Sequence, residues 1–578
     1  MIYSDIPSAQ QLVLTFQAKG IRNIVISPGS RNAPLTLSFA KQSYFNCYSI
    51  VDERCAGFFA MGMARQLQEP VAVLCTSGSA VLNYYPAVAE AYYSEVPLIV
   101  VSADRPAYKI DVGDGQTIRQ TDIFQKHIGF SANLKQDVSH APEVMAQFDK
   151  TLLVHTQQEI QAYNQFEILK ALEVAMVKRL PVHINVPFEE PLYGQTNNLK
   201  VVLPSEEDAL PGLEKLDDLE YFSKIWSSSS KKMVLIGVAQ PDTLAQDVLE
   251  KLGADTTVMV FTETTSNVHH DAFFPSIDSI IAPIEKSENK EALFKALQPD
   301  LLLTVGGMIV SKKIKAFLRQ YNPKVHWHVG QNRAYDTFFC LERHAAIEPT
   351  IFFRSLVSPQ APEQGYRILW DGVKTNYEQR REAYLNKIGY SDFSVFHQLQ
   401  KTIPKHYQVH LANSSTVRYT QLFPMDASLS VYCNRGTSGI DGSTATAVGA
   451  SVHYDSPTLL ITGDLSFLYD SNGLWFKGMR SDFRIININN TGGGIFRILP
   501  GKEDTIEFSS FFETVHELTA EHLAAMFGFE YLVATNANEL QNALKSFYTT
   551  SEKPKILEVF TPRLENDQIL LEYFDFIS

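Results

Sequence analysis

Short apolar runs alternate with longer stretches of helical periodicity along most of this chain. In the N-terminal third, the apolar runs predict strands at residues 21–26, 71–75, 98–102 and 182–186. Helical spacing predicts helices between these strands at residues 56–67 and 80–93. This alternation is typical of a parallel sheet covered by helices, in which ligands gather at the carboxyl ends of the strands.

The rhythm restarts twice, after polar, proline-containing segments at residues 194–218 and 357–366. In the second stretch strands are predicted at residues 232–237, 257–262, 301–305 and 324–329, and in the third at residues 407–411, 429–433, 457–462, 483–488 and 555–560. A chain of 578 residues is too long for one hydrophobic core. We therefore predict an α/β fold with three successive doubly wound parallel-sheet domains, at residues 1–193, 219–357 and 367–578.

Two of the predicted strands end in oxygen-bearing side chains. Asp464 follows the strand at 457–462, and Asn490 follows the strand at 483–488. Mg²⁺ prefers oxygen ligands and often shares its shell with phosphate oxygens. Together with the main-chain carbonyl of Gly492, these side chains predict a divalent-cation site that also holds a diphosphate. A helix that opens at about Leu465-Ser466 would direct N–H groups at the same diphosphate.

Glu53 lies between an apolar stretch and a helix of small residues. The helix dipole alone favours an acid at such a position, so a structural role is the simpler interpretation. A functional role requires a cofactor nitrogen beside the side chain. A carboxylate in an apolar pocket can share a proton with such a nitrogen.

Arginines gather at predicted strand ends although the net charge is −14. They occur in Ser27-Pro-Gly-Ser-Arg31, Asp104-Arg105-Pro106, Asn413-Ser-Ser-Thr-Val-Arg418 and Asn434-Arg435-Gly436. Gln116 lies in a glycine-rich loop of the same part of the chain as the first two motifs. Pairing with a nearby acid explains any single arginine. Four such loops in an acidic chain indicate an acidic substrate, because guanidinium groups bind carboxylates through two hydrogen bonds.

The composition, 45% apolar and 20% charged, is that of a globular enzyme. Its acidic balance argues against general binding to nucleic acid or to anionic membranes. Five scattered cysteines, an N-terminus without a signal-like apolar core and the lack of a long apolar run together predict a cytoplasmic protein with reduced cysteines.

These motifs resemble those of thiamine-diphosphate-dependent enzymes of the decarboxylase/carboligase superfamily, over essentially the full length. Within that superfamily the chain is most similar to the enzymes of menaquinone biosynthesis that join 2-oxoglutarate to isochorismate. The resemblance rests on the loops around Arg31 and Arg105, on Asp52-Glu-Arg54, Thr76-Ser-Gly78, Ile118-Arg-Gln120, Gly463-Asp-Leu-Ser466 and Asn489-Asn-Thr-Gly-Gly-Gly-Ile-Phe496, and on Asn434-Arg-Gly-Thr-Ser-Gly-Ile-Asp-Gly442. The last of these is specific to the menaquinone enzymes.

The resemblance implies a transferase that binds thiamine diphosphate and Mg²⁺ or Mn²⁺. Residues 1–193 would bind the pyrimidine and residues 367–578 the diphosphate, with active sites between the subunits of a homodimer or homotetramer. Glu53 would be the catalytic acid beside the aminopyrimidine. Further cofactor contacts would come from Gly78, Ile440, Asp464, Leu465, Ser466, Asn490 and Ile495, and the metal ligands would be Asp464, Asn490 and the carbonyl of Gly492.

The same resemblance implies the reaction. 2-Oxoglutarate would lose CO₂, and the succinyl-semialdehyde carbanion would add to isochorismate. The residues expected to face 2-oxoglutarate are Ser414, Arg418 and Arg435, and those expected to face isochorismate are Ser30, Arg31, Arg105, Gln116 and Lys312. Phe496 would wall the pocket beside Ile495. Gly115 stands where some relatives carry Asn, so the contact expected there is lost or made through the backbone.

Two other functions remain open at this point. One is a different thiamine-diphosphate carboligase, such as one that acts on pyruvate with a flavin in the middle domain; the arginine-rich loops disfavour it. The other is a catalytically silent scaffold subunit, which would be expected to lack Glu53, Asp464 or Asn490, although fold alone never establishes activity.

Overall fold

The computed structural model describes residues 2–202, 218–356, 365–499 and 503–578. The chain divides into two compact units. Unit 1 comprises Met1–Leu210, Gly436–Asp455 and Tyr469–Phe483, and unit 2 comprises Pro211–Arg435, Ser456–Leu468 and Arg484–Ser578. Most of the two predicted linkers lies outside the described residues. The three domain boundaries drawn from the sequence therefore stay predictions.

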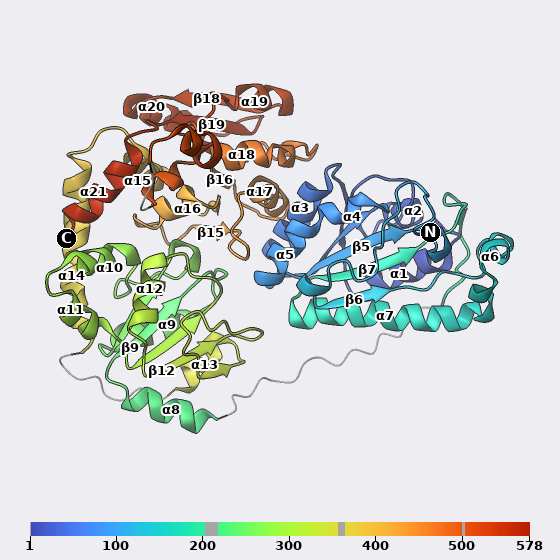
Figure 1. Ribbon diagram of the computed structural model, residues 1–578, viewed down its shortest axis with the longest axis horizontal. Coiled ribbons are helices and arrows are strands. Elements are labelled where there is room, and N and C mark those ends of the chain that lie inside the picture. The colour runs from blue at the N-terminus through green and yellow to red at the C-terminus, as the bar shows by residue number, and fades with distance from the viewer. Residues whose placement is uncertain (1, 203–217, 357–364, 500–502) are drawn as a thin grey trace. The chain divides into compact units, whose positions relative to one another are not determined.

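Unit 1 is built on a parallel six-stranded sheet in the order β3-β2-β4-β5-β7-β6 (Figure 1). Its strands are β2 (Asn23–Ile26), β3 (Asn46–Ser49), β4 (Val71–Cys75), β5 (Leu98–Asp104), β6 (Phe130–Asn133) and β7 (Val182–Pro187). The predicted strands are the four inner ones, which are buried as their apolar runs require. β3 and β6 escaped prediction because edge strands carry more polar, half-exposed side chains.

Helices pack against this sheet, and α7 runs along β6 and β7 (Figure 1). The helices of unit 1 are α1 (Pro7–Ala18), α2 (Ala33–Ala40), α3 (Glu53–Leu67), α4 (Ser79–Asn83), α5 (Tyr85–Tyr93), α6 (Pro142–Phe148), α7 (Gln157–Lys178) and α17 (Ser443–Ser451). A short antiparallel pair, β1 (Tyr3–Ser4) and β8 (Gln195–Thr196), lies apart from the main sheet.

Two predicted helix bounds were wrong. The helix expected at residues 56–67 begins earlier, at Glu53, because the Asp52 side chain caps it by accepting a hydrogen bond from Cys55 N at 3.2 Å. The helix expected at residues 80–93 is two helices that meet at Tyr84. Proline near the start of α5 accounts for the break, since it suits the first turn of a helix and disrupts its interior.

Helices α3 and α17 lie unusually close together in unit 1. A Cβ atom at Gly62 of α3 would lie 2.1 Å from the carbonyl oxygen of Thr446. A Cβ atom at Gly449 of α17 would lie 2.0 Å from the carbonyl oxygen of Phe59. Both distances are far below van der Waals contact, so only glycine allows the two backbones to approach this closely.

Unit 2 contains two parallel sheets, ordered β10-β9-β11-β12-β13 and β15-β14-β16-β17-β19-β18. The first consists of β9 (Lys232–Ile236), β10 (Val258–Thr262), β11 (Leu301–Val305), β12 (Val325–Val329) and β13 (Arg343–Ala345). The second consists of β14 (Gln408–Leu411), β15 (Ser430–Cys433), β16 (Thr458–Gly463), β17 (Arg484–Asn489), β18 (Glu530–Ala534) and β19 (Lys555–Phe560). All nine strands predicted here are present, and the edge strands β13 and β18 are additional.

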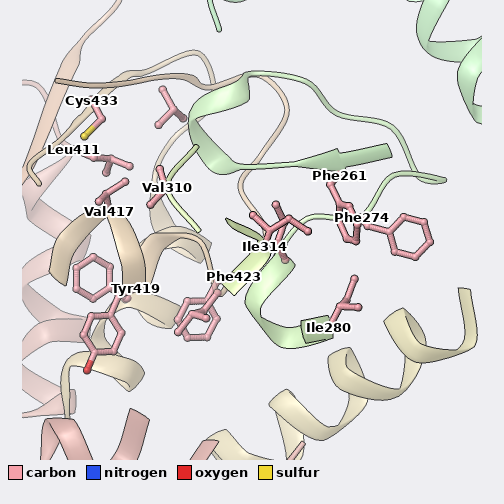
Figure 2. Close-up of a cluster of buried hydrophobic side chains, with 14 of the residues drawn as sticks. Phe261, Phe274, Ile280, Val310, Ile314, Leu411, Val417, Tyr419, Phe423 and Cys433 are labelled. Atoms are coloured by element: carbon pink, nitrogen blue, oxygen red, sulfur yellow. The ribbon is translucent and has the colours of Figure 1, made fainter. Parts of the chain in front are cut away.

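The helices that begin in unit 2 are α8 (Leu219–Ser228), α9 (Gln246–Ala254), α10 (Ile277–Lys286), α11 (Lys290–Leu297), α12 (Lys312–Gln320), α13 (Pro349–Ser355), α14 (Ile368–Leu385), α15 (Asp392–Thr402), α16 (Ser415–Thr420), α18 (Asp464–Tyr469), α19 (Glu521–Phe527), α20 (Ala537–Phe547) and α21 (Asn566–Phe576). One hydrophobic core serves both sheets. Figure 2 shows Phe261 and Ile280, from the region of the first sheet, and Leu411 and Tyr419, from that of the second, in this cluster.

The observed architecture confirms the predicted α/β fold of parallel sheets. Across the described residues, no helix is long and apolar enough to cross a membrane.

Candidate active site

The carboxyl edge of the second sheet in unit 2 brings Asp464 and Asn490 together. β16 and β17 are adjacent and parallel, with Gly463 opposite Ile488. Asp464 is the first residue of α18, so this helix begins one residue before the predicted start at Leu465-Ser466. Asn490 follows β17 directly. Because both residues directly follow neighbouring parallel strands, they lie at the same edge of the sheet, as the sequence predicts.

Asp464 is buried, at 3% exposure, and is surrounded by hydrogen-bond donors. Its Oδ1 accepts from Leu465 N at 2.6 Å, and its Oδ2 accepts from Gly492 N at 2.9 Å. His516 Nε2 lies 3.4 Å from Oδ2, and this contact with the carboxylate raises the pKa of His516. The Leu465 N–H predicted to face a diphosphate is therefore bonded to Asp464 in this structure.

Asn490 is oriented by a second buried acid, Asp392. Asn490 Nδ2 donates to Asp392 Oδ2 at 3.0 Å, and Thr561 Oγ1 donates to Asp392 Oδ1 at 2.6 Å. Burial, with a smaller contribution from the charge of Asp464, raises the pKa of Asp392 to about 6, although the hydrogen bonds from Thr561 and Asn490 oppose the rise. Since Nδ2 is used in this way, Asn490 Oδ1 is the atom that can serve as a metal ligand.

Gly492 completes this edge through its backbone. Its φ is +147°, and a Cβ atom there would lie 2.6 Å from the carbonyl oxygen of Glu513. Glycine is therefore required if its N–H is to reach Asp464. A carboxylate, an amide oxygen and a main-chain carbonyl form a donor set that fits a hard divalent cation.

Within the described ranges no group of three or more His, Cys, Asp or Glu residues could hold a metal ion. An ion at Asp464 would thus depend on the Asn490 amide, the Gly492 carbonyl and oxygens from outside the protein. That dependence is what a metal shared with a diphosphate requires.

Glu53 heads α3 in unit 1, and its neighbours anchor this end of the helix. Asp52 accepts a hydrogen bond from Asn472 Nδ2 at 2.9 Å. Arg54 donates to the Tyr469 carbonyl at 2.8 Å, and its guanidinium lies 4.6 Å from the centre of the Tyr469 ring. Glu53 itself is half-buried, and desolvation raises its pKa, with a further contribution from Asp52.

The β4 strand end places Gly78 against the loop that carries Gln116. Gly78 N donates to Gln120 Oε1 at 2.9 Å, and Ser77 Oγ donates to the Gln116 carbonyl at 2.9 Å. A Cβ atom at Gly78, whose φ is +86°, would lie 3.0 Å from the backbone of Gln116. Gly78 and Gln116, predicted for different ligands, are therefore neighbours.

Arg31 and Arg105 meet at one acid, Glu190. Arg31 is buried and donates to Glu190 Oε1 at 2.8 Å and to the Phe188 carbonyl at 3.0 Å. Arg105 Nη1 lies 3.8 Å from the same Glu190 oxygen, and its Nη2 donates to the Gly115 carbonyl at 3.0 Å. Burial and the charge of Arg105 lower the pKa of Arg31. Ser30 is exposed beside them.

A cavity of about 340 Å³ in unit 2 gathers further predicted residues. Arg418, Lys312 and Ile495 all line it, although they come from α16, α12 and the 3-10 helix η6 (Gly494–Ile498). Burial lowers the pKa of Arg418, and so does the positive charge of Arg435, whereas Asp278 and Glu263 oppose that effect. Among the described residues, the Arg418 side chain has no hydrogen-bond or ion-pair partner.

Other predicted residues do not line this cavity. Arg435 is buried and donates to Asn413 Oδ1 at 2.7 Å. Ser414 is the residue before α16, with a φ of +69°, and its side chain makes no capping hydrogen bond. Phe496 packs on Phe512, with ring centres 6.2 Å apart, and unlike its neighbour Ile495 is not a lining residue of the cavity. Ser466 is buried in α18, and Ile440 belongs to unit 1, where it is 38% exposed.

Several residues that shape these regions were not found from the sequence: Glu190, Glu263, Asp278, Asp392, Asn413 and His516. Asn413 belongs to the same sequence motif as Arg418, so the motif could have indicated that Asn413 lies near the site. The others carry no local signal, because their roles arise from contacts distant in sequence.

Comparison with known proteins gives the following matches. Residues 8–128 match the family "Thiamine pyrophosphate enzyme, N-terminal TPP binding domain" and residues 413–559 its C-terminal counterpart. Benzoylformate decarboxylase from Polynucleobacter necessarius is similar in structure, with a TM-score of 0.66, 13% identity and coverage of 96% of this chain and 99% of that one. A thiamin diphosphate-dependent enzyme from Mycobacterium smegmatis gives the same TM-score at 16% identity. These likenesses support the fold.

Sequence relatives are much closer. The chain is 50% identical to the 2-succinyl-5-enolpyruvyl-6-hydroxy-3-cyclohexene-1-carboxylate synthase of Christiangramia forsetii, over 100% of both chains. It is 49% identical to the enzyme of the same name from Flavobacterium johnsoniae, over 99% of both. At this identity and coverage, the chain belongs to the family of thiamine-diphosphate-dependent 2-succinyl-5-enolpyruvyl-6-hydroxy-3-cyclohexene-1-carboxylate synthases.

Proposed function

We propose that this protein decarboxylates 2-oxoglutarate and adds the remaining four-carbon unit to isochorismate, giving 2-succinyl-5-enolpyruvyl-6-hydroxy-3-cyclohexene-1-carboxylate and CO₂. The observation that carries the proposal is the full-length identity of 50% to a synthase of that name. Its support from the structure is the set of basic groups, Arg418 and Lys312 in unit 2 and Arg31 and Arg105 in unit 1, which suit acidic substrates.

Asp464, Asn490 and the Gly492 carbonyl would hold Mg²⁺ or Mn²⁺, and through it the diphosphate of the cofactor. Thiamine diphosphate, when bound, supplies the electron sink for loss of CO₂ and for carbon–carbon bond formation. Gly78, Ile440, Leu465, Ser466 and Ile495 would complete its binding site. Asp392 would act indirectly, since it fixes the orientation of the Asn490 amide.

Glu53 would hold a proton at its carboxyl group and share it with the aminopyrimidine nitrogen of the cofactor. Its half-buried position and raised pKa favour the protonated form nearer to neutral pH than for an exposed acid. The contacts of Asp52 and Arg54 fix the start of α3, so the Glu53 backbone is held in place.

Arg418, Arg435 and Ser414 would bind 2-oxoglutarate. Lys312, Arg31, Arg105, Gln116 and Ser30 would bind isochorismate, and Phe496 would lie at the edge of the pocket. Glu190 already pairs with Arg31 and Arg105, so an incoming carboxylate would share or displace that acid. Gly115 would act through its carbonyl, which orients Arg105.

The active form would be a homodimer or homotetramer in the cytoplasm. Five free cysteines agree with a reducing compartment. Size-exclusion chromatography with light scattering measures the assembly, and a monomer at working concentration would contradict this part of the proposal.

The decisive assay offers 2-oxoglutarate with isochorismate and, separately, pyruvate alone, each with thiamine diphosphate and Mg²⁺. Mass spectrometry should detect the condensed product from the pair together with CO₂. Chelation of the metal should abolish turnover, and either Mg²⁺ or Mn²⁺ should restore it. Turnover of pyruvate alone, without product from the pair, would instead support a different carboligase.

A further inference from the structure

Glu263 lies on the wall of the unit 2 cavity and has no part in the proposed chemistry so far. It directly follows β10 and is only 4% exposed. Both carboxylate oxygens accept main-chain hydrogen bonds: Val310 N donates to them at 2.9 and 2.8 Å, and Ser311 N donates to Oε1 at 2.7 Å. These two N–H groups belong to the turn directly before α12, and the first residue of α12 is Lys312.

The same turn is held by further contacts. Ser311 caps α12 by accepting from Ile314 N at 3.1 Å, and its hydroxyl donates to Asp278 at the start of α10. Lys315 Nζ donates to the Ile309 carbonyl at 2.9 Å. Glu263 therefore anchors, from β10, a turn that is also tied to α10 and to the first turn of α12.

An ionised carboxylate at this place is costly to the fold. Burial raises the pKa of Glu263 to about 7, although hydrogen bonds from the turn and the charge of Arg435 oppose the rise. The other charged groups that act on it are Asp278 and Lys315, and Glu263 in turn acts on Arg418. A buried acid that borders a cavity beside basic groups is more typical of a functional site than of a stabilising core.

We propose that Glu263 is a positioning residue of the substrate-binding cavity: its carboxylate fixes the turn before α12 and thereby holds Lys312 on the wall that also carries Arg418. This inference rests on the proposed function, in which Lys312 and Arg418 bind the acidic substrates. Glu263 acts through main-chain groups and does not itself touch substrate.

The test compares Glu263→Ala and Glu263→Gln with the wild-type enzyme. Alanine removes both acceptors, so the KM for isochorismate should rise about tenfold or more, as expected for loss of charge-assisted hydrogen bonds. The KM for 2-oxoglutarate should rise about threefold, and kcat should stay within about twofold. Glutamine keeps one acceptor oxygen, so its effect should be intermediate. The apparent affinity for thiamine diphosphate should not change.

Glu291→Gln is the matched control. Glu291 is exposed and accepts a hydrogen bond from Tyr321, which caps the other end of α12, at 2.6 Å. This variant should keep both KM values. A KM for isochorismate within about twofold of wild type in Glu263→Gln, or equal losses of kcat and cofactor affinity, would overturn the inference.

Failure of the proposed function is distinguishable from failure of this inference. If the wild-type enzyme forms no product from the two substrates, the proposed function fails whatever the variants do. Calorimetric titration with 2-oxoglutarate then tests Glu263 directly. Binding at least threefold weaker in Glu263→Gln than in wild type would support positioning, and unchanged binding would refute it.

Discussion

The two units hold the arginines proposed to bind substrate in different ways. In unit 1, Arg31 and Arg105 converge on Glu190, whose side chain is 58% exposed. In unit 2, Arg418 lines a cavity and its side chain makes no hydrogen bond or ion pair to any residue the structure describes, while burial and the charge of Arg435 lower its pKa. The first pair is oriented in advance by an acid that it contacts, whereas the Arg418 side chain forms no ion pair within the described ranges and the charges of Asp278 and Glu263, acting over a longer distance, oppose its repulsion by Arg435.

This difference should appear in binding. A substrate carboxylate at Arg31 exchanges one anion for another, so little is gained beyond the existing ion pair. A carboxylate at Arg418 relieves repulsion between two partly desolvated cations, which is worth more. Unit 2 should therefore supply most of the affinity for anions, and unit 1 most of the orientation.

Glu53 sharpens the comparison most, because it is an acid of unit 1 that, unlike Glu190, forms no ion pair with an arginine among the described residues. Glu53→Gln should lower kcat by at least about 100-fold while the fold is kept, since the carboxyl proton is lost. Glu69→Gln, an exposed acid just past the end of α3, is the control and should be neutral. Steady-state kinetics and circular dichroism measure both, and near-normal turnover in Glu53→Gln would contradict the role.

Arg418→Ala tests the unit 2 side of the comparison. The KM for 2-oxoglutarate should rise about 100-fold, which matches the loss of a buried charge-assisted pair of about 3 kcal/mol. Arg354→Ala removes an exposed ion pair with Asp247 and should change KM by less than about twofold. If the two variants behave alike, Arg418 is not poised for a ligand.

Glu190→Gln tests the unit 1 side. Removal of the competing carboxylate should lower the KM for isochorismate by about threefold, a modest effect because the acid is exposed. The gain should shrink as salt is raised, because exposed charges are screened. A higher KM would mean that Glu190 orients the arginines more than it competes for them.

The last prediction concerns stability and pH and involves no change in catalysis. The pKa of Glu263 is raised to about 7, so the native state binds its proton more tightly than the unfolded state does. The resulting stabilisation is complete below the unfolded pKa of about 4.5 and is lost as pH rises through 7, by up to about 3 kcal/mol. Glu263→Gln lacks this titration. Its melting temperature relative to wild type should therefore increase between pH 5 and pH 8, and a constant difference would show that Glu263 does not titrate in this range.

Much of the fold was predictable because buried parallel strands have continuous apolar sequences. The runs at β16 and β17 also located Asp464 and Asn490, since side chains at the ends of neighbouring strands must meet. Edge strands such as β3 and β18 lack that signal. The start of α3 at Glu53 depended on the Asp52 cap, a contact of one side chain that periodicity does not contain.

The partners of the site residues were not predictable in the same way. Glu190 follows a strand far along the chain from Arg31, and Asp392 opens a helix remote from Asn490. Each pairing joins positions widely separated in sequence, and only the folded chain brings them together. Motif similarity predicts which residues face ligands, whereas it gives no information on the residues that hold them in place.

The glycine seam between α3 and α17 has a mechanical consequence. Gly62 lies against the backbone of Thr446 and Gly449 against that of Phe59, so α3 and α17 cannot slide past each other and should move as one rigid body. The distance between Glu53, at the start of α3, and the residues before α17 should therefore stay constant during catalysis. A single methyl group added at either glycine would clash with the facing backbone and force the two helices apart, which would also shift Glu53 at the start of α3.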